Sequence, residues 1–177
     1  MRQRIIIIIG ITALALVATS AALAATLTAT ATVNGTAGIS LNLPSNPSVS
    51  STLDGTDQTV TYAPVLGVVD ARGSGAGWNL TVSATDFSDG SGHTLAPGTI
   101  TGVSAACKAG NSCTAATSSG ITYPLTVSGT SAKFFNAALN TGLGKIDVTP
   151  TFAVSIPGNA YAGTYTSTVT LASVSGP

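Results

Sequence analysis

The feature that most constrains the fold of this chain is a succession of short runs in which apolar and polar residues alternate. The runs are bounded by clusters of Gly, Pro, Asn, Ser and Asp, which favour turns. They cover residues 26–33, 38–43, 58–72, 77–87, 98–105, 120–128, 145–157 and 163–174. Because a period of two gives each strand one buried and one solvated face, the pattern predicts an all-β, antiparallel domain of about eight short strands.

The last run shows the alternation clearly, since Tyr165, Val169 and Leu171 fall on one face and threonines dominate the other. The whole chain has no Glu and only 7% charged residues, a composition that favours strands and turns over helices. A β-sandwich is the preferred architecture, and a barrel is the alternative that the sequence leaves open.

Prolines interrupt three of the runs, at Pro64, Pro124 and Pro150. Proline cannot donate a ladder hydrogen bond, so each of these strands should lie at a sheet edge, contain a bulge or break in two.

Residues 131–140 depart from the alternation. Phe134 and Ala138 are spaced i, i+4, as is the pair one residue further on, while Ser131 is a possible N-cap and Gly142 a possible stop. The spacing predicts one short helical segment there.

The N-terminus has the pattern of an export signal. Two arginines precede an apolar run too short for a stable membrane span, and the small-x-small sequence ending at Ala24 predicts cleavage after that residue. Residues 1–24 are therefore predicted to be a signal peptide, and 25–177 a single exported domain without a membrane span. A retained N-terminal anchor is the alternative. The sequence has no sortase-type sorting motif and no lipobox cysteine, so any surface attachment is expected to be non-covalent.

Charge excludes one class of partner. The predicted exported domain keeps four cations against six aspartates, without clustering. The cations are Arg72, Lys108, Lys133 and Lys145. No basic patch for nucleic acid or anionic lipid is expected.

Cys107 and Cys113 are the only cysteines. In an exported chain an even number of cysteines so close together predicts an intrachain disulfide. A redox or metal-binding pair is the alternative, which would need tighter spacing or further ligands.

Residues with catalytic or cofactor chemistry are scarce. His93 is the single histidine, no Gly-x-Ser-x-Gly elbow occurs, and no carboxylate pair of the glycosidase type can be assigned. The acidic turn at 86–92 lacks the ligand spacing of a calcium loop, and the glycines at 73–77 lead into a strand rather than a phosphate-binding helix. We expect no catalytic residues, no bound metal and no cofactor, although a Ser-His-Asp set assembled in space stays open.

The stretch 68–87 concentrates the unusual residues of the chain, including its single Trp. It resembles the WxL-domain family of bacterial surface proteins, because Trp78-Asn79-Leu80 follows an Asp-x-Arg-Gly element formed by Asp70, Arg72 and Gly73. The similarity covers roughly residues 58–177, and the segment 132–171 resembles the C-terminal half of the family. The resemblance implies non-covalent attachment to the cell wall through peptidoglycan.

One departure distinguishes this chain. The family typically carries a second Trp-x-Leu motif in its last strand, where this sequence has Leu171 and Ser173 instead, while Tyr165 and Thr170 are kept. The chain therefore resembles a divergent branch of the family.

Trp78 has two possible roles. Alternation places Trp78 and Leu80 on one face of a strand, which favours a core position. The alternative is a partly exposed ring that stacks on a sugar, with Asp70 and Arg72 as polar contacts. The pair Asp70 and Arg72 is more simply explained as a structural salt bridge. These four residues are the candidate binding residues.

The patterns predict a secreted, non-enzymatic protein, and the family resemblance implies a surface protein that binds peptidoglycan or another wall glycan, with other surface proteins as further possible partners. The rival hypothesis is a coat or filament subunit that assembles by strand pairing between chains.

Overall fold

The computed structural model describes residues 29–36 and 38–177. The chain divides into two compact units, Met1–Thr32 and Val33–Pro177. In the first unit, residues 29–32 are exposed and carry no regular secondary structure. The predicted signal peptide lies outside the described residues. In the part that is described, no helix is long and apolar enough to cross a membrane.

The second unit consists of antiparallel strands in three sheets. The largest sheet has the order β1-β3-β10-β7-β8, and β2 also pairs with β10. Its strands are β1 (Ile39–Asn42), β2 (Gln58–Tyr62), β3 (Leu66–Asp70), β7 (Thr99–Cys107), β8 (Leu125–Thr126) and β10 (Gly144–Ile156). The second sheet has the order β11-β4-β9, formed by β11 (Val169–Ser175), β4 (Trp78–Ala84) and β9 (Ala132–Ala137). A small hairpin pairs β5 (Phe87–Ser88) with β6 (Thr94–Leu95).

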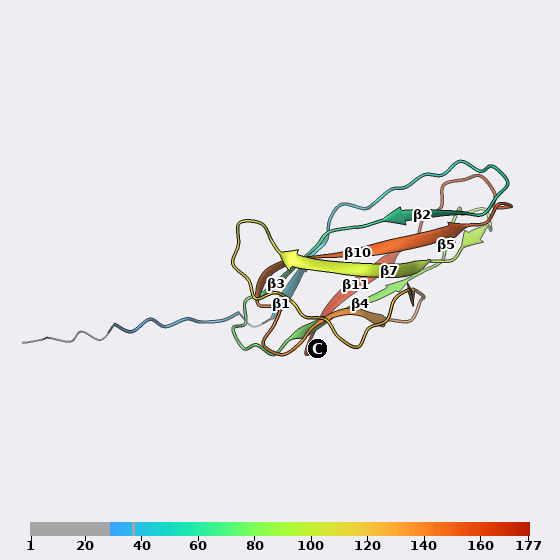
Figure 1. Ribbon diagram of the computed structural model, residues 1–177. Coiled ribbons are helices and arrows are strands. Elements are labelled where there is room, and N and C mark those ends of the chain that lie inside the picture. Colours follow the sequence, from blue (N-terminus) through green and yellow to red (C-terminus); the bar gives the residue numbers. More distant parts are fainter. Residues whose placement is uncertain (1–28, 37) are drawn as a thin grey trace, which may run out of the picture. The chain divides into compact units, whose positions relative to one another are not determined.

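The two larger sheets pack face to face around one hydrophobic core (Figure 1). The six-stranded sheet supplies Leu66, Val68, Ile100, Ile146, Val148 and Phe152, and the three-stranded sheet supplies Trp78, Leu80, Val82, Phe134, Phe135 and Ala137. On β3 and β10 buried residues alternate with more exposed ones, as the period of two requires. The predicted all-β, antiparallel sandwich is confirmed, with eleven strands of two to thirteen residues in the described part instead of about eight short ones.

The prolines act as predicted. Pro64 divides the run 58–72 into β2 and β3, which both pair with the long strand β10. Pro150 lies within β10 at the point where its neighbour on one side changes from β3 to β2, beside a bulge on the other side. Pro124 directly precedes β8, a two-residue strand at the end of the sheet order. Each proline thus lies where the ladder is interrupted or ends.

The predicted strand boundaries are less accurate than the pattern. In the last run, Val169 and Leu171 are half-buried while Thr170 and Ala172 are exposed, so the predicted faces are confirmed. The strand itself begins only at Val169. The strand predicted over 26–33 is wrong for residues 29–33, which have no regular structure, and residues 26–28 lie outside the described part.

The predicted helical segment near 131–140 is also wrong, because Ala132–Ala137 form strand β9. Opposite β4, Leu80 pairs with Phe135 and Thr81 with Lys133, which leaves Phe134 as the extra residue of a bulge. Phe134 and Phe135 are therefore both buried, although a regular strand would point them to opposite faces. A short apolar run of this kind fits a helix and a buried strand equally well.

Candidate functional site

Asp70 and Arg72 form a clamp at the end of β3. The Asp70 side chain is buried, and both of its carboxylate oxygens accept hydrogen bonds from the Arg72 guanidinium, at 2.9 Å from Nε and 2.8 Å from Nη2. The Arg72 backbone N–H donates to the same carboxylate at 3.1 Å. Such bidentate, charge-assisted contacts fix the guanidinium in one orientation.

The Arg72 guanidinium also joins the two main sheets. Nη2 donates to the carbonyl oxygen of Gly77 at 2.7 Å, just before β4, and Nη1 donates to Ser175 Oγ at the end of β11. Asp70 belongs to the six-stranded sheet, whereas β4 and β11 belong to the three-stranded sheet. The salt bridge therefore ties one end of the sandwich together.

The electrostatics of this clamp favour the ionised pair. Hydrogen bonds from the Arg72 side chain hold the pKa of Asp70 below its ordinary value of 3.8, against the opposing effect of burial. The same contact raises the pKa of Arg72. A buried carboxylate without such a partner would be strongly destabilising, so the two residues depend on each other.

Trp78 lies at the centre of the core. Its side chain has no exposed surface, its ring packs against Phe135 with centroids 5.8 Å apart, and its Nε1 donates to the carbonyl oxygen of Gly142 at 2.9 Å. Leu80 is equally inaccessible. The predicted core position of both residues is confirmed.

Two glycines permit this close packing. Gly142 has φ of 74°, and a Cβ there would lie 2.5 Å from the Ala137 Cβ and 2.6 Å from the Trp78 Nε1. Gly77 has φ of 68°, and a Cβ would lie 2.5 Å from the Ala137 carbonyl oxygen. Only glycine can adopt this positive φ at both positions and also fit the space available there.

The residues that replace a second Trp-x-Leu motif lie beside the first one. Leu171 pairs with Val82 and Ser173 pairs with Leu80 on the neighbouring strand. Leu171 is half-buried against the core. Leu171 thus adds an apolar side chain to the edge of the core, whereas Ser173 adds none.

The predicted disulfide joins Cys107 and Cys113, with Cα atoms 5.6 Å apart. The disulfide closes the turn after β7. The backbone of Cys113 also forms an isolated antiparallel β-bridge with Gly144 at the start of β10. The Nζ atom of Lys108, within the turn, lies 3.6 Å from Oδ1 of Asp147 on β10. These contacts staple the turn to the central strand.

Of the four candidate binding residues, only Arg72 reaches the surface, with its side chain 10% exposed. Asp70, Trp78 and Leu80 are inaccessible to a partner in this structure. A surface that binds a partner would therefore have to include other residues.

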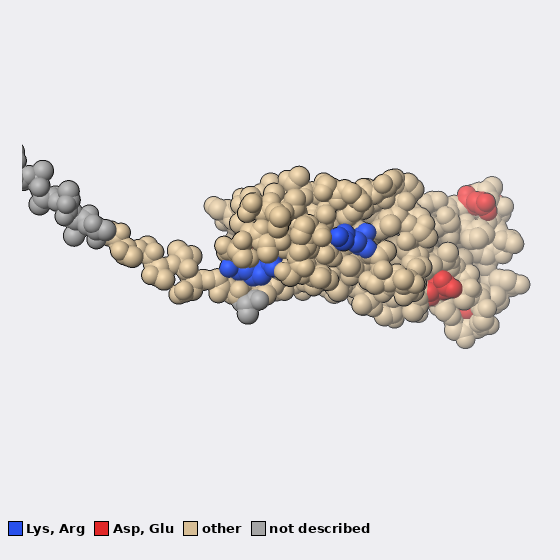
Figure 2. Space-filling view, turned by 90° about the horizontal axis from the view of Figure 1, so that it is seen from below, with Lys and Arg blue, Asp and Glu red and all other residues tan. Residues whose placement is uncertain are grey.

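A groove of about 1130 Å³ lies on the surface of the second unit. It runs between the extended segment 46–53 and the segment 160–169. Its apolar part includes Val60, Val154 and Ile156 from β2 and β10, and Leu95 from β6. Its lining also includes Phe87, three tyrosines and many Ser and Thr side chains, and no lining residue is charged. Charged side chains are also sparse and set apart over the face shown in Figure 2.

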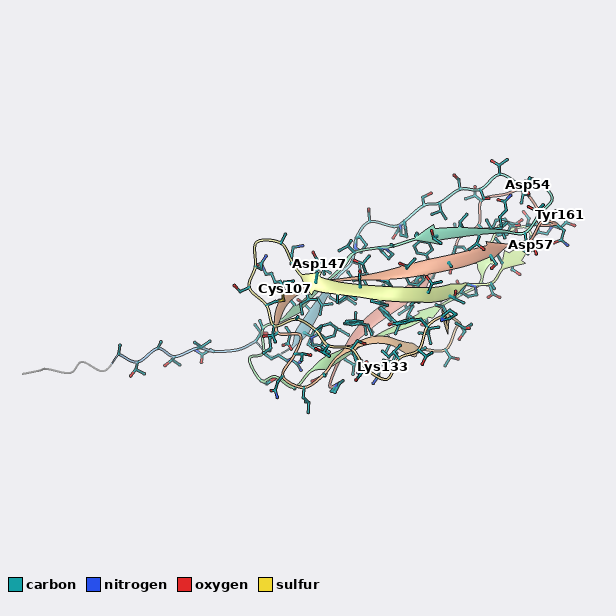
Figure 3. All side chains as sticks on the ribbon, viewed as in Figure 1. Asp54, Asp57, Cys107, Lys133, Asp147 and Tyr161 are labelled. Atoms are coloured by element: carbon teal, nitrogen blue, oxygen red, sulfur yellow. A yellow bond between two sulfur atoms is a disulfide. The ribbon has the colours of Figure 1, made fainter. Side chains whose placement is uncertain are left out.

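Hydrogen bonds hold one end of the groove in shape. Asp54 Oδ1 accepts from the Thr56 backbone N–H at 2.9 Å and from Gln58 Nε2 at 3.1 Å, and these contacts lower the pKa of Asp54 from 3.8 to about 2. Asp57 Oδ1 accepts from the Gly158 backbone N–H at 2.8 Å, which links the two loops. Asp54, Asp57 and Tyr161 all lie at this end of the unit (Figure 3).

An aromatic stack forms part of the groove wall. Tyr161 is 64% exposed as a residue, and its ring stacks on the His93 ring with centroids 3.8 Å apart and an angle of 17° between the planes. His93 Nδ1 lies 2.6 Å from Asp89 Oδ2, and the Tyr165 hydroxyl donates to the Tyr161 carbonyl oxygen at 3.0 Å. Within the described residues, no Ser, Thr or Cys side chain hydrogen bonds to His93.

The groove was not predicted from the sequence. Its lining comes from segments with no recognisable motif, and its aromatic residues are far apart in the chain. The nearest signal is the clustering of Tyr161 and Tyr165 in a region otherwise made of small residues. In the described part of the chain, no group of three or more His, Cys, Asp or Glu side chains could hold a metal ion.

The fold and these features define an antiparallel β-sandwich domain whose Trp-x-Leu strand is buried in the core, with an uncharged, hydroxyl-rich groove on its surface. Residues 25–171 match the family model described as WxL domain surface cell wall-binding, and the chain therefore belongs to the WxL-domain family. The family is one of cell-wall-binding surface domains, in agreement with the predicted location and partner class. Searches of curated proteins and of solved structures gave no match.

Proposed function

We propose that this protein is exported and attaches non-covalently to the bacterial cell wall by binding peptidoglycan, without catalysing a reaction. The family match over residues 25–171 is the observation that carries this proposal. It covers the clamp, the Trp-x-Leu strand and the groove, so the parts of the domain described above lie within the matched region.

The four candidate residues contribute to this function indirectly. Asp70 and Arg72 join the sheets, and Trp78 and Leu80 fill the core between them. Their role is to hold the folded surface that meets the wall. Loss of the fold should therefore abolish attachment even where no contact residue has changed.

The absence of enzymatic chemistry is supported by the surroundings of the single histidine. Asp89 and His93 are paired as the acid and base of a hydrolase triad are, but in the described residues no Ser, Thr or Cys side chain hydrogen bonds to His93. A base without a nucleophile in reach does not make a triad.

The sheet edges bear on the alternative of a coat or filament subunit. The end strands of the large sheet, β1 and β8, have only four and two residues, which give few backbone groups for pairing between chains. The end strands of the three-stranded sheet, β11 and β9, have seven and six residues, so such a subunit would have to pair through these edges. Size-exclusion chromatography over a range of concentrations tests this, because a filament subunit would assemble as concentration rises.

Co-sedimentation with purified host walls tests the proposed function. We expect the folded protein to pellet with the walls and to be released by guanidinium chloride at its full length, because no covalent bond holds it. Protein that stays in the supernatant, or that is released only by a wall hydrolase, would contradict the proposal.

A further inference from the structure

We infer that the groove between residues 46–53 and 160–169 binds an uncharged, N-acetylated amino-sugar segment of a wall glycan, with the Tyr161 ring as a stacking platform. The inference rests on the proposed function and assigns a ligand class and a site to it. It places the sugar contacts away from Trp78, Asp70 and Arg72, which the sequence offered as an alternative binding site.

The size and lining of the groove suit a small ligand. Sites for such ligands typically have volumes of roughly 300–1,000 Å³ and combine apolar surface with a few polar groups. This groove is of comparable size, at about 1130 Å³, and combines apolar surface from β2 and β10 with hydroxyl-bearing walls. The larger volume fits an elongated ligand of several sugar units.

The lack of charged residues in the groove lining distinguishes among the wall polymers that could bind there. Anionic wall polymers carry phosphate groups, and stem peptides carry free carboxylates and amines, so recognition of either calls for charged partners. None of the residues that line the groove is Lys, Arg, Asp or Glu. An uncharged glycan is the wall component that enters this groove without a desolvated, unpaired charge.

The polar groups of the groove match a sugar. Three of the four tyrosines in the chain line it, namely Tyr62, Tyr161 and Tyr165. Serine and threonine hydroxyls surround them, and each can donate or accept a hydrogen bond. The apolar surface beneath suits the methyl of an acetamido group and the C–H face of the sugar ring.

The Tyr161 ring is well placed for stacking. One of its faces lies against His93, which is held in turn by Asp89, and Tyr161 as a residue remains 64% exposed at the groove wall. An exposed aromatic ring that is held in place loses little conformational entropy on binding. The face of the Tyr161 ring that points away from His93 is therefore the one proposed to stack on a sugar.

The test combines a ligand titration with wall sedimentation. The probe is the tetramer of β-1,4-linked N-acetylglucosamine, and its deacetylated, cationic counterpart is the matched ligand control. Binding to the exported protein is measured by titration calorimetry, and the site is located from amide chemical-shift changes. We expect shifts in residues of the two segments that bound the groove, and weaker binding of the deacetylated tetramer.

Three variants test the stacking platform. Tyr161→Ala should raise the dissociation constant about tenfold, and Tyr161→Phe should retain binding because the ring remains. Leu139→Ala is the control, since Leu139 is 63% exposed and lies outside the groove. It should change the dissociation constant by less than about twofold. Thermal unfolding of each variant confirms that the fold is intact.

The outcomes separate this inference from the proposed function. If the unmodified protein does not pellet with walls, the proposed function fails and the inference fails with it. If it pellets but the tetramer does not bind, or binds outside the groove, the inference alone is overturned. If Tyr161→Ala weakens pelleting and removal of the stem peptides from the walls abolishes it, the groove binds peptide and the glycan assignment is wrong.

Discussion

Trp78→Phe and Trp78→Ala separate the two contributions of the buried indole. The indole fills the core against Phe135, and its Nε1 satisfies the buried carbonyl of Gly142. Phenylalanine keeps most of the packing but leaves this acceptor without its partner, at a cost of about 1–3 kcal/mol. Alanine loses the packing as well, and truncation of a buried tryptophan costs roughly 3–5 kcal/mol.

Thermal unfolding measures this difference. For a unit of this size, 1 kcal/mol corresponds to about 2–4 °C in Tm. The Phe variant should therefore melt about 4–8 °C below the unmodified protein if it loses about 2 kcal/mol, and the Ala variant should melt lower still. Both variants should bind walls normally while they remain folded, because the ring has no exposed surface.

Two results would refute this reasoning. If Trp78→Ala melted at the same temperature as the unmodified protein, the ring would not be a core residue. If the folded Trp78→Phe variant lost wall binding without losing stability, the ring would contact the ligand, as in the alternative role considered from the sequence.

Three further changes have defined outcomes. Gly142→Ala should destabilise the fold by about 2–3 kcal/mol in urea unfolding, because φ of 74° and the contact at 2.5 Å both disfavour a side chain; an unchanged midpoint would contradict the packing described. Replacement of Cys107 and Cys113 by serine should cost about 2 kcal/mol and preserve wall binding, and complete unfolding of that variant would show that the disulfide is more than a local staple. The pKa of Asp70 is lowered in the folded state, so its stabilisation is fully present above its ordinary pKa of 3.8 and is lost as pH falls through the lowered value. The free energy of unfolding should therefore fall less steeply with decreasing pH in Asp70→Asn than in the unmodified protein. The variant is nevertheless less stable at neutral pH, because Arg72 loses its charged partner. Equal slopes of unfolding free energy against pH in the two proteins would contradict the argument.

The sequence predicts the features of this fold that depend on local periodicity. Alternation identifies the strands and their buried faces, and the rule that proline interrupts a ladder explains the division at Pro64. The same alternation places Trp78 in the core. These features follow from backbone geometry and burial, which act over a few residues.

The sequence fails where packing between distant segments decides the outcome. The spacing of Phe134 and Ala138 fits a helix, but a bulge opposite β4 buries this segment as a strand. The groove depends on contacts such as the stack of His93 on Tyr161, between residues that no local pattern connects. The hydrogen bond from the Arg72 guanidinium to Ser175 Oγ was likewise not predictable, because it depends on where β11 lies in the folded sheet.

The most direct test of the account is a binding isotherm on peptidoglycan from which the anionic wall polymers have been removed. We predict saturable binding that persists after this removal, is largely insensitive to salt because no charged residue lines the groove, and is lost when the glycan strands are digested by a muramidase. Binding that disappears together with the anionic polymers, or that falls steeply with added salt, would contradict it.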